Sequence, residues 1–91
     1  MSIQIVPKTE KADYYPIIDE AIEAIKASGL KHMVTPFSTV IEGSYDELME
    51  LARLAQQKCL EAGANELLVN IQLHLKQNAD VTFEEKISKH T

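Results

Sequence analysis

Apolar and polar residues alternate along two segments of the chain, one near its start and one after its midpoint. In residues 2–7 the side chains of Ile3 and Ile5 fall on one face, a period-two pattern typical of a strand with one buried side. Residues 65–76 carry the longest alternation, with apolar side chains at every odd-numbered position from Leu67 to Leu75. We therefore predict two strands, the first ending at Pro7 and the second running the full length of its segment.

Between these strands, apolar residues recur instead at spacings of three and four, which is typical of an amphipathic helix. One helix is predicted from about Tyr14 to Ser28, with Asp13 as its cap, Pro16 in its first turn and Gly29 just after its end. The side chains expected to be buried along it are Ile18, Ala21, Ile22 and Ile25.

A second helix is predicted to begin at Ser44, because Glu47 three residues later completes a capping box, and to end at Gly63. Its buried stripe is expected to consist of Leu48, Leu51, Ala52, Ala55 and Cys59. A similar pair, Thr82 with Glu85, favours a short C-terminal helix or a tail that follows a strand.

Residues 31–34 and 38–42 lie on either side of Pro36, whose fixed backbone angle suits a turn. We predict a hairpin of two short strands here. The element order is then β-α-β-β-α-β, and two right-handed split βαβ halves give a four-stranded antiparallel sheet of order 4-1-3-2. The prediction is one α+β domain of ferredoxin-like architecture over residues 1–91.

In this architecture both helices cover one face of the sheet and leave the other face open. The open face is predicted to carry Gln4, Val6, Leu68, Asn70, Gln72 and His74. Its apolar members sit among groups well suited to pairing, so we expect self-association, as a homodimer or homotetramer, through this face or a strand edge.

Composition narrows the class of protein further. The chain has 91 residues, 45% hydrophobic and 25% charged, which is ordinary for one globular domain. A net charge of -5 gives no basic surface for nucleic acid. No apolar run approaches the roughly 18 residues of a membrane helix, and the N-terminus lacks a secretory pattern. With one cysteine, which indicates a reducing compartment, we expect a cytoplasmic protein.

Metal and nucleophile chemistry are poorly supported by the residue pattern. His32, His74 and His90 fall on separate elements, and the first two on opposite edges of the predicted sheet. Cys59 continues the buried stripe of the second helix, where cysteine behaves as a small hydrophobe. Neither a nucleophile–base pair nor two converging carboxylates can be recognised, so we predict a protein that is not an enzyme and uses no metal or cofactor.

Four segments of the chain resemble one family. The strand "IQIVP", the helix end "SGLKH", the segment "TPFSTVIEG" and the tail "VTFEEKISKH" are similar to the YkoF-like thiamine-binding protein family of small ferredoxin-like domains. The most specific part is the T-x-x-E-G pattern of Thr39, Glu42 and Gly43. The resemblance implies a protein that binds thiamine or its hydroxymethylpyrimidine precursor without transforming it and that assembles as dimers or dimers of dimers.

Such a ligand needs a donor–acceptor edge for its aminopyrimidine, a polar partner for its hydroxymethyl group, and a carboxylate or aromatic face for a thiazolium cation. The segment "FSTVIE" supplies each type, but strand alternation separates Thr39 from Ser38 and Glu42, so neighbouring strands must complete the pocket. The candidate ligand-binding residues are Thr39, Glu42, Ser38, Gln4, Asn70 and Phe37.

Each candidate also has a purely structural interpretation. Thr39 suits a strand, Glu42 suits the positive start of the next helix, and Ser38 suits the flank of a turn. Phe37 could pack, and Gln4 and Asn70 could be solvated or part of an interface. The leading hypothesis is a binding module for thiamine or its pyrimidine moiety in transport, storage or salvage. The alternative is an oligomeric regulatory or protein-interaction module that uses the open sheet face.

Overall fold

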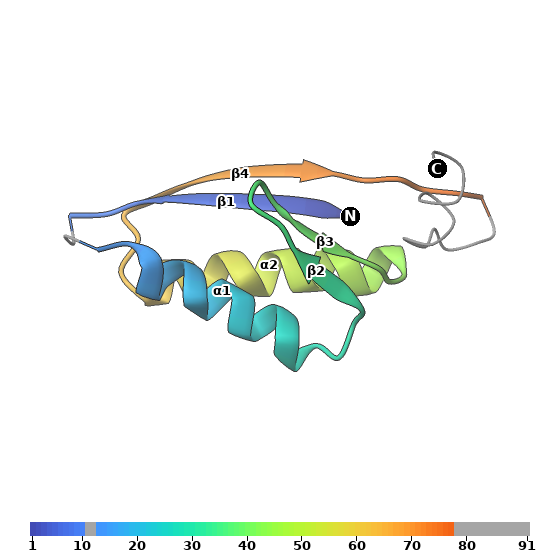
Figure 1. The fold of residues 1–91 in the computed structure, drawn as a ribbon, viewed down its shortest axis with the longest axis horizontal. Coiled ribbons are helices and arrows are strands. Elements are labelled where there is room, and N and C mark those ends of the chain that lie inside the picture. Colours follow the sequence, from blue (N-terminus) through green and yellow to red (C-terminus); the bar gives the residue numbers. More distant parts are fainter. Residues whose placement is uncertain (11–12, 78–91) are drawn as a thin grey trace.

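A computed structural model describes residues 1–10 and 13–77 and confirms the predicted element order (Figure 1). The elements are β1 (Ser2–Lys8), α1 (Tyr15–Ala27), β2 (His32–Val34), β3 (Thr39–Ile41), α2 (Tyr45–Glu61) and β4 (Glu66–Gln72). Neighbouring strands are antiparallel, and the sheet order β2-β3-β1-β4 is the predicted order read from the other edge. The C-terminal helix predicted at Thr82 lies outside the described residues.

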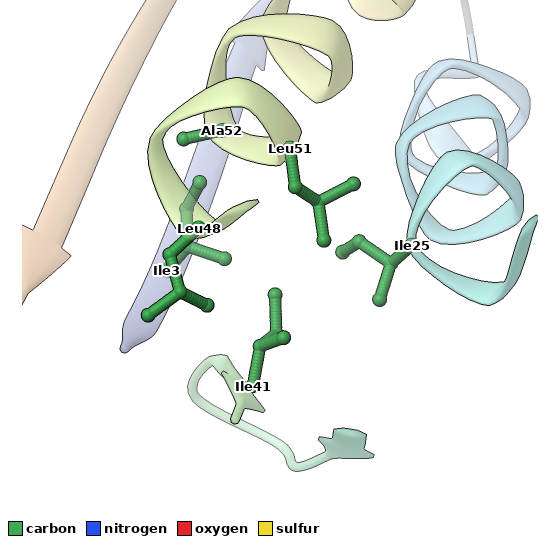
Figure 2. Close-up of a cluster of buried hydrophobic side chains, with 6 residues drawn as sticks. All are labelled: Ile3, Ile25, Ile41, Leu48, Leu51 and Ala52. Carbon is green, nitrogen blue, oxygen red and sulfur yellow. The ribbon is translucent and has the colours of Figure 1, made fainter. Parts of the chain in front are cut away.

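The molecule has two layers, with α1 and α2 on the same side of the sheet (Figure 1). The apolar faces of both layers meet in a core cluster to which β1, β3 and both helices contribute. Figure 2 shows its six buried side chains pointing toward one another: Ile3, Ile25, Ile41, Leu48, Leu51 and Ala52. On the opposite face Gln4, Val6, Leu68 and Asn70 are exposed, as the alternation of β1 and β4 predicts.

The stripe of α2 is buried as predicted, but the stripe of α1 is displaced around the helix. The buried residues of α1 are Ile17, Ala21, Ala24 and Ile25, while Ile18 and Ile22 are only half-buried. The reason is that Ile17 and Ala21 pack against Ala55 and Cys59 of α2, a contact that the pattern of α1 alone could not reveal.

The predicted cap of α1 is wrong by one residue. Tyr14 is the N-cap residue and makes no side-chain capping bond, whereas the Asp13 carboxylate accepts a hydrogen bond from the Tyr15 N–H at 3.0 Å. Pro16 lies in the first turn, and Gly29 ends the helix with a φ of 74°, both as predicted.

Two strand ends also differ from prediction, for reasons of pairing. β1 continues through Pro7 to Lys8. The even-numbered residues of β1 make its hydrogen bonds to β4, and Pro7, which has no N–H, faces away from β4, so no bond of this ladder is lost. β4 ends at Gln72 instead of Lys76, since Gln72 already lies opposite Ser2 and β1 has almost no chain left to pair with.

The capping box at the start of α2 gives a direct test of local stability. The Ser44 side chain accepts from the Glu47 N–H at 3.3 Å, and the Ser44 N–H donates to the Glu47 carboxylate at 3.0 Å. Replacing Ser44 with alanine is expected to lower the free energy of unfolding by about 1 kcal/mol, measured by urea denaturation at neutral pH.

The matched control is Glu47→Gln, which keeps a side chain able to accept from the Ser44 N–H, loses only the charge and should therefore cost less than Ser44→Ala. The bond from the Ser44 N–H, followed by that from the Ser44 side chain, lowers the pKa of Glu47. The ionised Glu47 carboxylate therefore adds to the free energy of unfolding above its ordinary pKa. This contribution is lost as the pH falls through the lowered pKa of the folded protein. An Ser44→Ala loss no larger than that of Glu47→Gln would contradict the role of the cap.

Candidate functional site

The ladder between β1 and β3 is short. Met1 exchanges two backbone hydrogen bonds of 2.8 Å with Ile41, and the register then pairs Ser2 with Val40 and Ile3 with Thr39. No further pair joins these strands among the described residues, although β1 goes on pairing with β4 as far as Lys8. The sheet is therefore open between the second half of β1 and the β2–β3 hairpin.

The hairpin turn is closed on itself by Thr35. The Thr35 N–H and hydroxyl both donate to the Ser38 carbonyl, at 2.9 and 2.7 Å, and the hydroxyl oxygen accepts from the N–H groups of Phe37 and Ser38 at 3.3 and 3.1 Å. Because these groups bond one another, the turn does not extend the ladder toward β1.

A cavity of about 510 Å³ lies where the ladder stops. Its walls are residues 3–7 of β1 and residues 34–39 of the hairpin, and α1 with its preceding residue supplies the third side. The α1 side consists of Tyr14, Ile18, Ala21, Ile22 and Ile25. The half-buried state of Ile18 and Ile22 thus has a cause, since both face this cavity and not the sealed contact with α2.

The lining is mainly apolar and carries no carboxylate, ammonium, guanidinium or imidazole group among the described residues. Two aromatic side chains contribute to the lining, Tyr14 from the residue before α1 and Phe37 from the hairpin turn. Phe37 is 83% exposed, the largest fraction among the exposed large apolar side chains. A ring so poorly covered has apolar surface available for a flat ligand.

Thr39 is the most informative of the predicted site residues. It is 8% exposed and lies in the cavity wall. Among the described residues its hydroxyl has no hydrogen-bond partner, and no polar side-chain atom there is fully buried without one. The hydroxyl therefore keeps some accessible surface, and because Thr39 lines the cavity it is a candidate donor or acceptor for a ligand.

Ser38, Phe37 and Gln4 also line the cavity, and the structure brings them together with Thr39. The Ser38 hydroxyl accepts a hydrogen bond from the Ser2 hydroxyl at 2.9 Å. Asn70 lies outside the lining, on the open face, and its amide donates to Gln4 Oε1 at 3.2 Å. Asn70 therefore does not line the cavity, and its bond holds the Gln4 side-chain amide on the open face of the sheet.

Glu42 lies apart from the other predicted residues. It follows β3, is half-buried and does not line the cavity, and its N–H donates to the Lys31 carbonyl at 2.9 Å. Sequence reasoning in turn missed Tyr14 and Ile5 as wall residues. Tyr14 was predicted at the start of the first helix, and only the tertiary fold brings it to the same cavity as β1.

Cys59 does not belong to this site. It is fully buried, its thiol donates to the Ile17 carbonyl at 3.6 Å, and burial, followed by the charge of Glu20, raises its pKa. The described residues contain no group of three or more potential metal ligands. Neither α1 nor α2 combines the length and apolar character of a membrane-crossing helix, and the described part of the chain has no other α-helix.

With this geometry in place, comparison with protein families matches residues 1–91 to the family described as thiamine-binding protein. The chain belongs to the thiamine-binding protein family. The resemblance drawn from four short segments is thereby confirmed. A relative of this family member, a UPF0045 protein of Clostridium perfringens, is 34% identical over 90 residues, which is 99% of this chain and 94% of the relative.

Two solved structures support the same membership. A domain of unknown function, DUF77, from Bacillus cereus matches this thiamine-binding family member with a TM-score of 0.92 and 36% identity, over 99% of this chain and 86% of that one. A candidate thiamine biosynthesis/salvage protein from Thermotoga maritima matches with a TM-score of 0.84 and 31% identity, over 99% and 95% of the two chains.

Proposed function

We propose that this protein binds thiamine, or its hydroxymethylpyrimidine moiety, in the cavity between β1, α1 and the β2–β3 hairpin. Family membership supports a thiamine-related small-molecule role, and the observation that carries the location is the Thr39 hydroxyl, which bonds no described residue, in a mainly apolar cavity wall. The cavity volume of about 510 Å³ falls within the range of small-molecule sites.

The chemistry of the wall fits the two rings of thiamine. A flat heterocycle can lie against the apolar side chains of α1, and Tyr14 and Phe37 add aromatic surface to the lining. A thiazolium cation is attracted to such faces, and the net charge of -5 also favours a cation over an anion. The hydroxyls of Thr39 and Ser38 can pair with the polar atoms of the ligand.

The absence of cationic side chains from the described wall leads to a prediction about phosphorylated ligands. Thiamine at about ten times its dissociation constant adds about 1.4 kcal/mol of stability and should raise the melting temperature by about 8 °C. Thiamine diphosphate at the same concentration should give a clearly smaller shift, because a buried phosphate needs paired charges that this wall does not offer.

Thermal melting with thiamine, hydroxymethylpyrimidine and thiamine diphosphate, followed by calorimetric titration, checks this prediction. Inorganic diphosphate is the control for nonspecific effects of the anion. No shift with thiamine and none with hydroxymethylpyrimidine would contradict the proposed function, and a larger shift with thiamine diphosphate would contradict the assignment of this cavity.

The binding is proposed to be non-catalytic and to serve transport, storage or salvage in the cytoplasm. Val6 and Leu68 are 38% and 55% exposed on the open face of the sheet, which favours self-association as a homodimer or homotetramer. An interaction module that uses this face is the second candidate function. Its distinguishing property is assembly that does not change when thiamine is added, which sizing at several concentrations measures.

A further inference from the structure

The gap between β1 and the hairpin leaves backbone groups of two β1 residues, Ile5 and Pro7, without a hydrogen-bond partner among the described residues. Successive residues of an antiparallel strand point their N–H and C=O groups to opposite sides. Met1 exchanges both hydrogen bonds with Ile41, so the odd-numbered residues of β1 point toward β3 and the even-numbered residues toward β4. The Lys8 carbonyl, which accepts from the Asn65 N–H at 2.8 Å, agrees with this assignment.

Ile5 is the first odd-numbered residue beyond the end of the β1–β3 ladder. Continuing the register would place it opposite Phe37, but Phe37 belongs to the turn that Thr35 closes on itself. No described residue pairs with the N–H or the C=O of Ile5. Ile5 lines the cavity, so this adjacent donor and acceptor are available to a molecule bound there.

Pro7 is the next odd-numbered residue of β1, and it differs from Ile5 in its backbone groups. It has no N–H, so only its carbonyl faces the gap, and Ile5 is left as the single complete donor–acceptor pair of the strand in the cavity wall. A carbonyl and an N–H side by side on a strand edge match a ring in which an amino group stands next to an unprotonated nitrogen. The amino group donates to the carbonyl, and the ring nitrogen accepts from the N–H.

We propose that the backbone of Ile5 recognises the amino–nitrogen edge of a flat heterocycle, much as a neighbouring strand would pair with it. This proposal rests on the proposed function in taking thiamine as the probe, whose pyrimidine ring carries such an edge. It deepens that function by assigning ligand selectivity to the backbone. It also places the hydroxyl of Thr39, the β3 residue in the last pair of the β1–β3 ladder, beside the same ring.

The test is a single-atom change in the backbone. Replacing residue 5 by the corresponding α-hydroxy acid turns its N–H into an ester oxygen and keeps the isoleucine side chain. The full 91-residue chain can be assembled by ligation at the native Cys59, which leaves no foreign residue. Calorimetric titration should give about tenfold weaker thiamine binding, because a donor is lost and an oxygen faces the ring nitrogen instead.

The matched control is the same ester at Val69, which lies opposite Ile5 in β4. The Val69 N–H points away from β1, to the outer edge of the sheet. In both variants the carbonyl of the preceding residue becomes an ester carbonyl, which is a weaker hydrogen-bond acceptor, and in both it belongs to the β1–β4 ladder. The Val69 ester should therefore lower the melting temperature by a similar amount while it changes thiamine affinity by less than twofold.

A ligand-side change tests the same pair independently. Exchanging the amino group of thiamine for an oxo group places a hydrogen on the ring nitrogen, which reverses the donor–acceptor order. The oxo compound should bind the unmodified protein about tenfold more weakly than thiamine does, because the Ile5 groups then face like partners.

Unchanged thiamine affinity in the Ile5 ester would overturn the backbone proposal and leave the proposed function in place. If the unmodified protein fails to bind thiamine, the proposed function falls for that ligand, and 4-amino-5-hydroxymethyl-2-methylpyrimidine becomes the probe. A tenfold loss of its binding in the Ile5 ester would support the backbone proposal, and no binding to the unmodified protein would overturn it.

Discussion

Replacing Thr39 with valine is expected to weaken thiamine binding at least tenfold without lowering the stability of the free protein. Threonine and valine side chains have nearly the same shape, so the packing around this buried position of β3 is kept and only the hydroxyl is lost. That hydroxyl has no partner among the described residues, so no intramolecular hydrogen bond disappears with it. The loss falls on the ligand, for which one good hydrogen bond in an apolar cavity is worth about 1.4 kcal/mol.

Calorimetric titration and a melting curve of the same variant separate these two effects. Thr35→Val is the matched control, because Thr35 also lies in the cavity wall but its hydroxyl makes three hydrogen bonds that close the hairpin turn. This variant should melt at a lower temperature. A Thr39→Val protein that binds thiamine as well as the unchanged chain would remove the Thr39 hydroxyl from the site.

The largest loss of stability is expected for Ile41→Ala. Ile41 is 1% exposed and points from β3 into the cluster of Figure 2, between Ile25 of α1 and Leu48 of α2. Removing three carbons leaves a cavity that its neighbours in two helices and two strands cannot fill without moving. The free energy of unfolding should fall by about 3 kcal/mol, a large part of the total for a domain of this size.

Urea denaturation measures this loss, and Ile41→Val is the conservative control. Valine removes one methylene and should cost about 1 kcal/mol. Ile41 also exchanges two backbone hydrogen bonds with Met1, so the alanine variant additionally tests how far the end of the β1–β3 ladder depends on the packing of this side chain. Equal stabilities of the alanine and valine variants would mean that the site collapses freely and that the cluster is less tightly packed than described.

Sequence reasoning succeeded where the signal is local. The capping box at Ser44, the left-handed glycines at Gly29 and Gly63, and the stripe of α2 are each written within a few neighbouring residues. The stripe of α1 was displaced because the choice between Ile17 and Ile18 as the buried residue depends on where α2 lies. The end of β4 was placed too late for a similar reason, since alternation continues after the partner strand has stopped.

The candidate site shows the same division. Residue type pointed to Thr39, Ser38, Phe37 and Gln4, and the fold brings these four to one cavity, although their part in ligand binding stays a prediction. Glu42 and Asn70 were chosen on the same grounds and lie outside the wall. The contribution that we propose for the Ile5 backbone has no side-chain signature in the sequence, because it depends on where two strands stop pairing.

A sheet that stops pairing halfway also has a hazard, because an exposed strand edge can recruit any extended polypeptide and begin aggregation. In this protein the unpaired length of β1 that faces the gap is very short. Pro7 offers no donor, α1 closes the space from one side, and the self-contained turn closes it from the other. A second chain could make too few hydrogen bonds there to remain attached, so the opening that we propose for a ring-sized ligand is too short to hold a polypeptide.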